Sequence, residues 1–226
     1  MENKVSKKEY GYFLLGFVGF IVVSALMMNG KLAVVDFLLQ SGVLSVRNPV
    51  LTAFFVPFSY SGNWQVVVPL CLILLLLKKT RTGYGVPLTM TALTSVTFYQ
   101  ILKHLFSRAR PDQSLHLLEQ AGYSFPSGHS LTSFLVWGML ALLLIYYQRT
   151  AGAPLPFYKK KTEAFAYIKS VSRLRLINLL LYAYIALMGF SRIYVGVHWP
   201  SDVLCSWFLA TAVLVVLKKI IWKQSL

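Results

Sequence analysis

The chain has 226 residues, of which 57% are hydrophobic and 13% are charged, and its mean hydropathy is +0.62. Soluble domains contain roughly 45–50% apolar residues, so this composition excludes an ordinary soluble protein and predicts an integral membrane protein. The formal net charge of +15 comes from short basic clusters between long apolar stretches. That pattern is typical of loops that set membrane topology, so we predict no nucleic-acid partner.

Six apolar segments predict an all-α bundle of six transmembrane helices, forming a single domain over residues 1–226. The first segment, residues 10–30, follows a short basic tail, as a signal peptide would. No small-residue cleavage site follows it and more apolar segments come later, so we predict a membrane span. The other predicted spans are residues 64–77, 82–102, 131–147, 176–190 and 203–217.

Residues 31–63 predict an interfacial or re-entrant segment, because Pro49, Pro57 and Gly62 interrupt its apolar pattern. The two cysteines have no metal-ligand spacing, and we predict no disulfide.

The distribution of lysine and arginine predicts the orientation of the bundle. With six spans and the N-terminus in the cytoplasm, 16 of the 22 Lys and Arg residues fall on the cytoplasmic side. This agrees with the positive-inside rule and places both termini and a hydrophilic loop at residues 148–175 in the cytoplasm. The remaining basic residues lie on the outer face against this trend, which makes them functional candidates.

The segment SRIYVGVHWPSD, from Ser191 to Asp202, combines three chemically useful side chains where one apolar segment ends and the next begins. Arg192 suits an anionic oxygen, because its planar guanidinium donates paired hydrogen bonds. His198 suits nucleophilic or acid–base chemistry, and Asp202, about one helical turn later, suits holding its ring. Pro200 favours the first turn of a helix, so His198 is expected just outside that helix.

Two further segments fall on the same predicted outer face. The first is KHLFSRARP, which carries Lys103 and Arg110, and the second is PSGH, which ends in His129. Because PSGH directly precedes an apolar helix, free backbone amides at that helix start can face an anion. The three segments together predict one cation-rich pocket with two imidazoles, which suits a phosphate group.

These segments resemble the three-part signature of the type 2 phosphatidic acid phosphatase superfamily, K-x6-R-P, P-S-G-H and S-R-x5-H-x3-D. Every fixed position is matched here, in the same order. The resemblance implies that His198 attacks phosphorus and forms a phosphohistidine, that Asp202 holds its other ring nitrogen, and that His129 protonates the leaving oxygen. It implies a phosphate-binding set of Lys103, Arg110, Ser127, Gly128 and Arg192. It also implies catalysis without a metal or another cofactor.

The resulting hypothesis is a lipid phosphatase or diphosphatase of the bacterial cytoplasmic membrane, with its active site on the outer side. Its partners would be the bilayer and a lipid substrate such as phosphatidylglycerophosphate, undecaprenyl diphosphate or phosphatidic acid, with no obligate protein partner. A lipid phosphotransferase and a non-catalytic lipid-phosphate binder or transporter stay open as alternatives. Vanadate-dependent haloperoxidases have a similar anion site, but they are soluble proteins. Arg108 matches no fixed position and is interpreted as a membrane anchor or a secondary headgroup contact, and His104 and His116 are given no role.

Overall fold

The computed structural model describes residues 6–150 and 164–224, which form helices and connecting loops without any strand. The helices are α1 (Lys7–Met28), α2 (Ala33–Ser45), α3 (Pro49–Tyr60), α4 (Trp64–Leu76), α5 (Val86–Phe106), α6 (Gly128–Thr150), α7 (Ala164–Tyr194) and α8 (Pro200–Gln224). A π-helical turn, Arg81–Gly85, precedes α5, and a short 3-10 helix, Gln113–Leu115, lies in the loop after it. The all-α prediction is therefore confirmed over the described residues.

Four helices within the described part of the chain are long and apolar enough to cross a membrane: α1, α6, α7 and α8. A fifth candidate arises if α3 and α4 are taken as one span, bent by 47°. Helix α5 has 21 residues, but its many Ser, Thr, Tyr and Gln residues keep it outside this set. The predicted membrane class is confirmed, while six spans and their orientation stay predictions.

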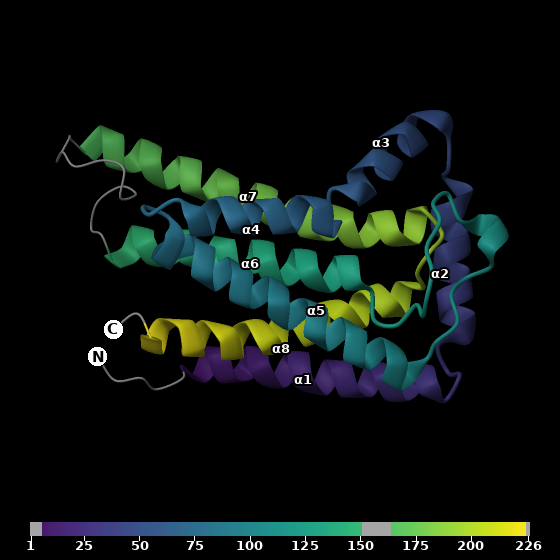
Figure 1. The fold of residues 1–226 in the computed structure, drawn as a ribbon. Coiled ribbons are helices and arrows are strands. Elements are labelled where there is room, and N and C mark those ends of the chain that lie inside the picture. The colour runs from purple at the N-terminus through teal and green to yellow at the C-terminus, as the bar shows by residue number, and fades with distance from the viewer. Residues whose placement is uncertain (1–5, 151–163, 225–226) are drawn as a thin grey trace.

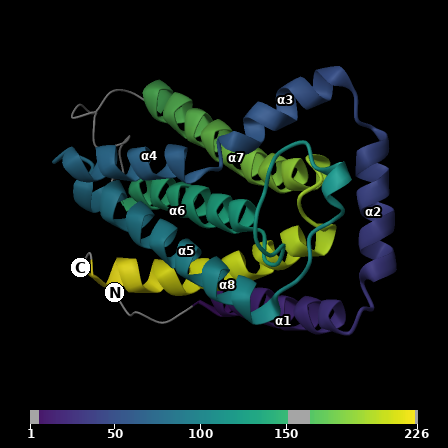
Figure 2. The same cartoon turned by 45° about the vertical axis from the view of Figure 1, so that its right-hand side comes forward.

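Most of the helices run along one common direction, and α2 does not. Figure 1 shows α1 and α4 to α8 side by side, with α2 crossing one end of the bundle. The turned view in Figure 2 keeps α2 across that end, with α3 leading from it toward α4. The N-terminal start of α1, the C-terminal end of α8 and the turn between α4 and α5 lie at the opposite end. This arrangement agrees with the interfacial segment predicted at residues 31–63.

Helix α6 forms the centre of the bundle. Its side chains Leu131, Leu135 and Met139 are fully buried and pack between α5, α7 and α8. Helix α1 packs closely along α8. At Gly16 the two backbones are so near that an added Cβ would stand only 2.6 Å from the carbonyl oxygen of Phe208. A core of this kind fixes where the two ends of α6 and α8 lie relative to each other.

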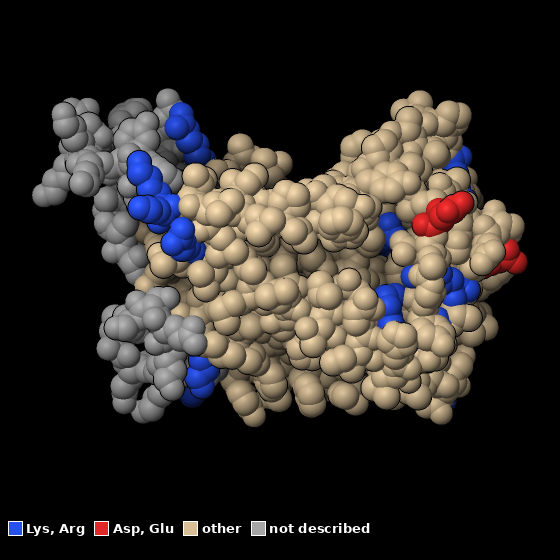
Figure 3. All heavy atoms as spheres, viewed as in Figure 1, with Lys and Arg blue, Asp and Glu red and all other residues tan. Residues whose placement is uncertain are grey.

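Charge separates to the two ends of the molecule. On the face shown in Figure 3, Lys and Arg side chains gather at both ends, Asp and Glu gather at the α2 end, and the surface between carries neither. The uncharged surface is rich in exposed apolar side chains, including Leu72, Leu93 and Leu179. An uncharged, apolar band of this kind is expected where a protein surface contacts the hydrocarbon core of a membrane.

Some helices are longer than the predicted spans, because they include charged residues that lie beyond the apolar stretch. Residues 164–175 were predicted as part of a loop but form the first three turns of α7, which carry Lys169, Arg173 and Arg175. Charge marks the edge of the apolar stretch, and backbone hydrogen bonding can continue past it. Residues 148–150 of the predicted loop are also helical, and residues 151–163 lie outside the described residues.

Candidate active site

The three signature segments meet at the end of the bundle that α2 crosses. They surround one cavity of about 530 Å³. The charged and imidazole side chains that line it are Lys103, Arg110, Glu119, His129, Arg192 and His198, and Gly128, the first residue of α6, lines it as well. The structure thus brings together residues up to 95 positions apart that the sequence analysis had predicted to share a pocket.

His198 lies in the turn between α7 and α8. Gly196 supplies the positive φ of 82° that this turn requires, and α8 begins at Pro200 as predicted. The His198 ring is 2% exposed, with Nδ1 3.3 Å from Asp202 Oδ2 and Nε2 3.4 Å from Arg110 Nη1. Asp202 also accepts a 2.9 Å hydrogen bond from the Trp199 amide. A proton on Nδ1 shared with Asp202 leaves the Nε2 lone pair facing the cavity.

Burial and positive charge keep the His198 ring neutral. Burial is the main cause that holds its pKa well below the ordinary range, and Arg110, Lys103 and Arg192 add to it. Burial also lowers the pKa of Arg110 to about 10, which leaves its guanidinium charged at neutral pH. The pair is therefore a neutral imidazole next to a fixed cation, which suits attack on a bound anion.

The three cations are held by backbone and neutral side chains, and within the described residues none of them forms an ion pair with a carboxylate. Lys103 donates to the Tyr123 carbonyl. Arg110 donates to the carbonyls of Gly122 at 2.8 Å and Val197 at 2.7 Å. Carbonyl groups fix the orientation of a guanidinium without neutralising it, so the positive field remains available to an anion.

Arg192 points at the cavity from within the protein. It is 1% exposed, donates to Ser59 Oγ, and donates to Gln120 Oε1 at 2.8 Å. Its Nε is buried and has no hydrogen-bond partner. A buried guanidinium nitrogen without a partner is costly, so Arg192 is held in place although the described residues do not satisfy all of its donors.

His129 stands across the cavity from this group, in the first turn of α6. Its Nε2 is 2.6 Å from Asn63 Oδ1, at the bend between α3 and α4. A Cβ on Gly62 would be 2.8 Å from the His129 ring, so only glycine allows the bend to lie this close. Ser127 is fully buried and accepts a 2.9 Å hydrogen bond from Ser130 Oγ. It therefore supports the start of α6, and it is not among the residues that line the cavity.

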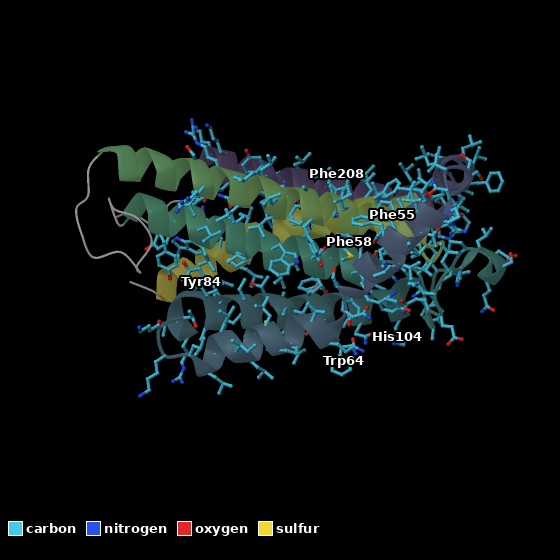
Figure 4. The ribbon with its side chains drawn as sticks, turned by 90° about the horizontal axis from the view of Figure 1, so that it is seen from above. Phe55, Phe58, Trp64, Tyr84, His104 and Phe208 are labelled. Atoms are coloured by element: carbon cyan, nitrogen blue, oxygen red, sulfur yellow. The ribbon has the colours of Figure 1, made fainter. Side chains whose placement is uncertain are left out.

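The cavity continues from the charged group into an apolar passage between α4 and α5. Trp64 is 70% exposed and projects away from the bundle at the start of α4, as Figure 4 shows. Several lining side chains are partly exposed on the outer surface, so the passage is open to the surroundings of the bundle. The apolar side chains that line it are Val67, Val68, Leu72, Leu75, Leu93 and Val96.

The interpretation of Arg108 as an anchor or headgroup contact is wrong. Its guanidinium lies 2.6 Å from both Asp36 Oδ2 and Asp202 Oδ1, and it does not line the cavity. Asp36 and Asn63 were also missed as contributors to the site. Each pairs with a residue more than 60 positions away, so no local pattern in the sequence could reveal them.

The remaining polar residues of the predicted loops take local roles. His116 Nε2 lies 3.0 Å from the Pro111 carbonyl, and His104 makes an edge contact with the Tyr123 ring. Asp112 accepts a hydrogen bond from the Ser114 amide at 2.8 Å. Across residues 6–150 and 164–224, no three His, Cys, Asp or Glu side chains are grouped so that they could hold a metal ion.

Known proteins are similar to this chain in sequence over most of its length. Phosphatidylglycerophosphatase B of Bacillus subtilis is 25% identical over 190 residues, which cover 83% of this chain and 84% of that protein. Undecaprenyl-diphosphatase of Sulfolobus acidocaldarius is 26% identical over 211 residues, which cover 90% of this chain and 88% of that protein.

Solved structures extend the similarity to three dimensions. The transmembrane PAP2-type phosphatidylglycerolphosphate phosphatase from Bacillus subtilis has a TM-score of 0.75 at 22% identity, covering 93% of this chain and 96% of that one. LpxE of Aquifex aeolicus has a TM-score of 0.59 at 25% identity, covering 83% and 94%. The sequence model of the PAP2 superfamily matches residues 84–226, which hold all three signature segments. The chain therefore belongs to the PAP2 superfamily and is a membrane-embedded phosphoric ester hydrolase.

Proposed function

We propose that this phosphatase hydrolyses a lipid phosphate or diphosphate at the outer face of a bacterial cytoplasmic membrane, through a phosphohistidine on His198. The observation that carries the proposal is the cavity itself. At one end three cations and two imidazoles converge, and from there an apolar passage leads between two helices. A phosphorylated headgroup fits the first part, and the lipid tail fits the second.

In the first step, the Nε2 lone pair of His198 forms a bond to phosphorus while the bond from phosphorus to the lipid oxygen breaks. Asp202 accepts a hydrogen bond from the Nδ1–H group, which stays on the ring, and stabilises the positive charge that the ring acquires. His129 gives its proton to the leaving oxygen, so the lipid departs as a neutral alcohol or, from a diphosphate, as a lipid monophosphate. Lys103, Arg110 and Arg192 stabilise the negative charge on the three non-bridging oxygens.

In the second step, water attacks the phosphohistidine. His129, now neutral, takes a proton from the water, the bond between nitrogen and phosphorus breaks, and inorganic phosphate leaves. Ser127 contributes by capping α6, since its Oγ accepts a hydrogen bond from the Ser130 amide, and the free amides at the start of this helix, where Gly128 lines the cavity, would favour a bound anion. No step uses a metal ion, because the three side-chain cations supply the positive charge.

The membrane arrangement belongs to the same proposal. Helices α1, α4 with the end of α3, α5, α6, α7 and α8 form six spans, and both termini are cytoplasmic. The cavity lies at the end opposite the start of α1 and the end of α8, so in this orientation its side is extracytoplasmic. The distribution of Lys and Arg supports this orientation. Phosphate release by right-side-out vesicles from a substrate that cannot cross the membrane tests the assignment.

The decisive experiment is phosphate release from purified protein in detergent with EDTA present, comparing wild type with His198→Ala. Phosphatidylglycerophosphate, undecaprenyl diphosphate and phosphatidic acid are assayed in parallel, and their kcat/KM values rank the substrates. We expect the variant to lose at least about 1,000-fold in rate. His104→Ala is the matched control, because His104 is exposed and does not line the cavity.

Two results would count against the proposal. Undiminished release by His198→Ala would exclude the phosphohistidine. A folded wild type that binds the lipids without releasing phosphate would favour the binder, and transfer of phosphate to a second lipid would favour the phosphotransferase.

A further inference from the structure

The fully buried side chains of helix α2 are polar. They are Asp36 and Gln40, whereas Val34, Phe37 and Leu38 are more than 60% exposed, and near the end of the helix the partly buried Val43 packs against the core around Phe55. A helix that packs on a protein core normally turns its apolar side inward. The contacts of Asp36 therefore decide how α2 is held.

Asp36 binds the N-terminus of α8. Its Oδ1 accepts a 2.8 Å hydrogen bond from the Ser201 amide, and its Oδ2 accepts a 2.6 Å hydrogen bond from Ser201 Oγ. Ser201 is the second residue of α8, directly before Asp202. A carboxylate at this position is favoured by the free amides and the dipole of the helix, and it fixes the first turn of α8 in place.

Arg108 joins this carboxylate to Asp202. One guanidinium nitrogen, Nη2, pairs with Asp36 Oδ2, and the other, Nη1, donates to Asp202 Oδ1 at 2.6 Å and to Ser201 Oγ at 2.7 Å. The guanidinium carbon also lies 5.6 Å from the centre of the Trp199 ring. With two buried carboxylates on its two nitrogens, Arg108 completes a bridge from α2 to the start of α8.

We propose that Asp36 and Arg108 are positioning residues for the nucleophile, and this inference rests on the proposed role of His198. Arg108 holds Oδ1 of Asp202, so Oδ2 must face His198 Nδ1 and the Trp199 amide. Fixing the carboxylate fixes the tautomer and the direction of the imidazole. Neither Asp36 nor Arg108 lines the cavity, so both act through Asp202.

Charge gives the bridge a second effect. The groups that face Asp202 are Arg108, Lys103, Arg110 and His198, with Cys205 one turn further along α8 and Asp36 behind Arg108. Arg108 favours the ionised form of the buried Asp202 carboxylate, and Asp36 compensates Arg108, so no extra cation is added to the site. Without Arg108, Asp202 would take up a proton at higher pH and release its hold on His198.

The test measures kcat, KM and the pH profile of kcat for Arg108→Gln, Arg108→Lys and Asp36→Asn, using the substrate on which the wild type is most active. We expect Arg108→Gln to lower kcat about 100-fold while KM changes by less than about twofold. The acid limb of the pH profile of kcat for this variant should move up by about one pH unit. Arg108→Lys should restore part of kcat, because it returns the charge but cannot bridge both carboxylates. Asp36→Asn, which is isosteric, should lower kcat about tenfold.

Matched controls separate positioning from general damage to the fold. Arg173→Gln and Asp112→Asn remove an exposed arginine and an exposed aspartate elsewhere, and both should behave as wild type. Thermal unfolding in detergent shows whether each variant is folded. If Arg108→Gln does not fold, Arg108→Lys and Asp36→Asn decide the question.

The proposal is overturned if folded variants keep the wild-type kcat and pH profile, or if KM rises while kcat stays unchanged. The second outcome would make Arg108 a contact to the substrate headgroup. An inactive wild type would instead contradict the proposed function, so the two failures are distinguishable.

Discussion

The two histidines of the cavity have opposite surroundings. His198 is 2% exposed and is backed by ionised groups, Asp202, Arg108 and Asp36, which tie together a loop and two helices. We call this side the nucleophile wall. His129 is backed by one neutral amide, Asn63, at a bend between two helices. We call His129, Asn63 and Gly62 the leaving-group wall.

Under the proposed mechanism, the difference follows from what each wall has to accommodate. The nucleophile wall would meet the phosphoryl group, which is the same in every substrate, and its buried ion pairs favour a single geometry. The leaving-group wall would protonate the leaving oxygen and meet the part of the substrate that varies, and it adjoins the apolar passage between α4 and α5. The residues at the bend would therefore affect substrate selection more than the ion-pair network does, in line with the principle that a fold alone does not fix specificity.

The largest effect on the leaving-group wall should come from His129→Ala. We expect a loss of about 1,000-fold on the lipid substrate, because the leaving alkoxide then departs without a proton. An aryl phosphate, whose phenolate leaves readily, should lose only about tenfold. Initial rates on the two substrates test this, with His104→Ala as the control. An equal loss on both would show that His129 binds phosphate instead of acting as an acid.

A smaller effect is expected when the partner of His129 is removed. Asn63→Ala should lower kcat about tenfold with little change in KM, because the ring loses the acceptor that orients it. Gln65→Ala is the matched control, since Gln65 also lines the cavity but makes no hydrogen bond to His129. Steady-state kinetics that give the same kcat for both variants would contradict the positioning role of Asn63.

The apolar passage should affect binding more than chemistry. Leu93→Trp fills the passage and should raise KM for a long-chain lipid phosphate about fivefold, while kcat/KM for a water-soluble phosphate ester stays unchanged. Ile101→Trp is the control, because Ile101 lies on the same helix, is 61% exposed and does not line the cavity. An unchanged KM for Leu93→Trp would show that the tail lies elsewhere.

The smallest effect should come from mild acidification. The pKa of His198 lies well below its ordinary value of about 6.5, so the neutral nucleophile persists and kcat/KM should show no loss from its protonation down to about pH 6. The unfolded chain binds a proton at about pH 6.5 where the folded chain does not. Stability from this group is therefore present above that pH and falls as the pH drops toward the folded pKa. A pH series of rates and of thermal unfolding measures both quantities.

Local patterns in the sequence predicted much of the fold. The apolar segments at residues 10–30, 131–147 and 203–217 lie almost wholly within α1, α6 and α8, because a long uncharged and mainly apolar stretch can satisfy its backbone in a membrane only as a helix or a closed barrel. The start of α8 at Pro200 was also predicted, since proline favours the first turn of a helix, whereas α7 continues to Tyr194, four residues beyond the predicted span end at residue 190.

Contacts between distant segments were not predictable in the same way. Arg108 and Asp36 are separated by 72 positions, and Asn63 and His129 by 66. Each pair is polar, and neither pair belongs to a periodic pattern or a spaced motif. The direction of α2 is set by Asp36 and Gln40, its fully buried residues, together with Val43, while most of its other apolar side chains face outward.

The passage between α4 and α5 opens toward the lipid, so the relevant substrate concentration is the one in the membrane and not the one in solution. Under the proposed mechanism, the substrate enters sideways from the leaflet, so its mole fraction among the lipids governs the rate. Diluting a vesicle suspension with buffer would leave turnover per enzyme unchanged, whereas adding inert lipid to the same vesicles would slow it. The competitors of the substrate are then the other phosphorylated lipids of that leaflet, and soluble phosphate esters compete only through the charged end of the cavity.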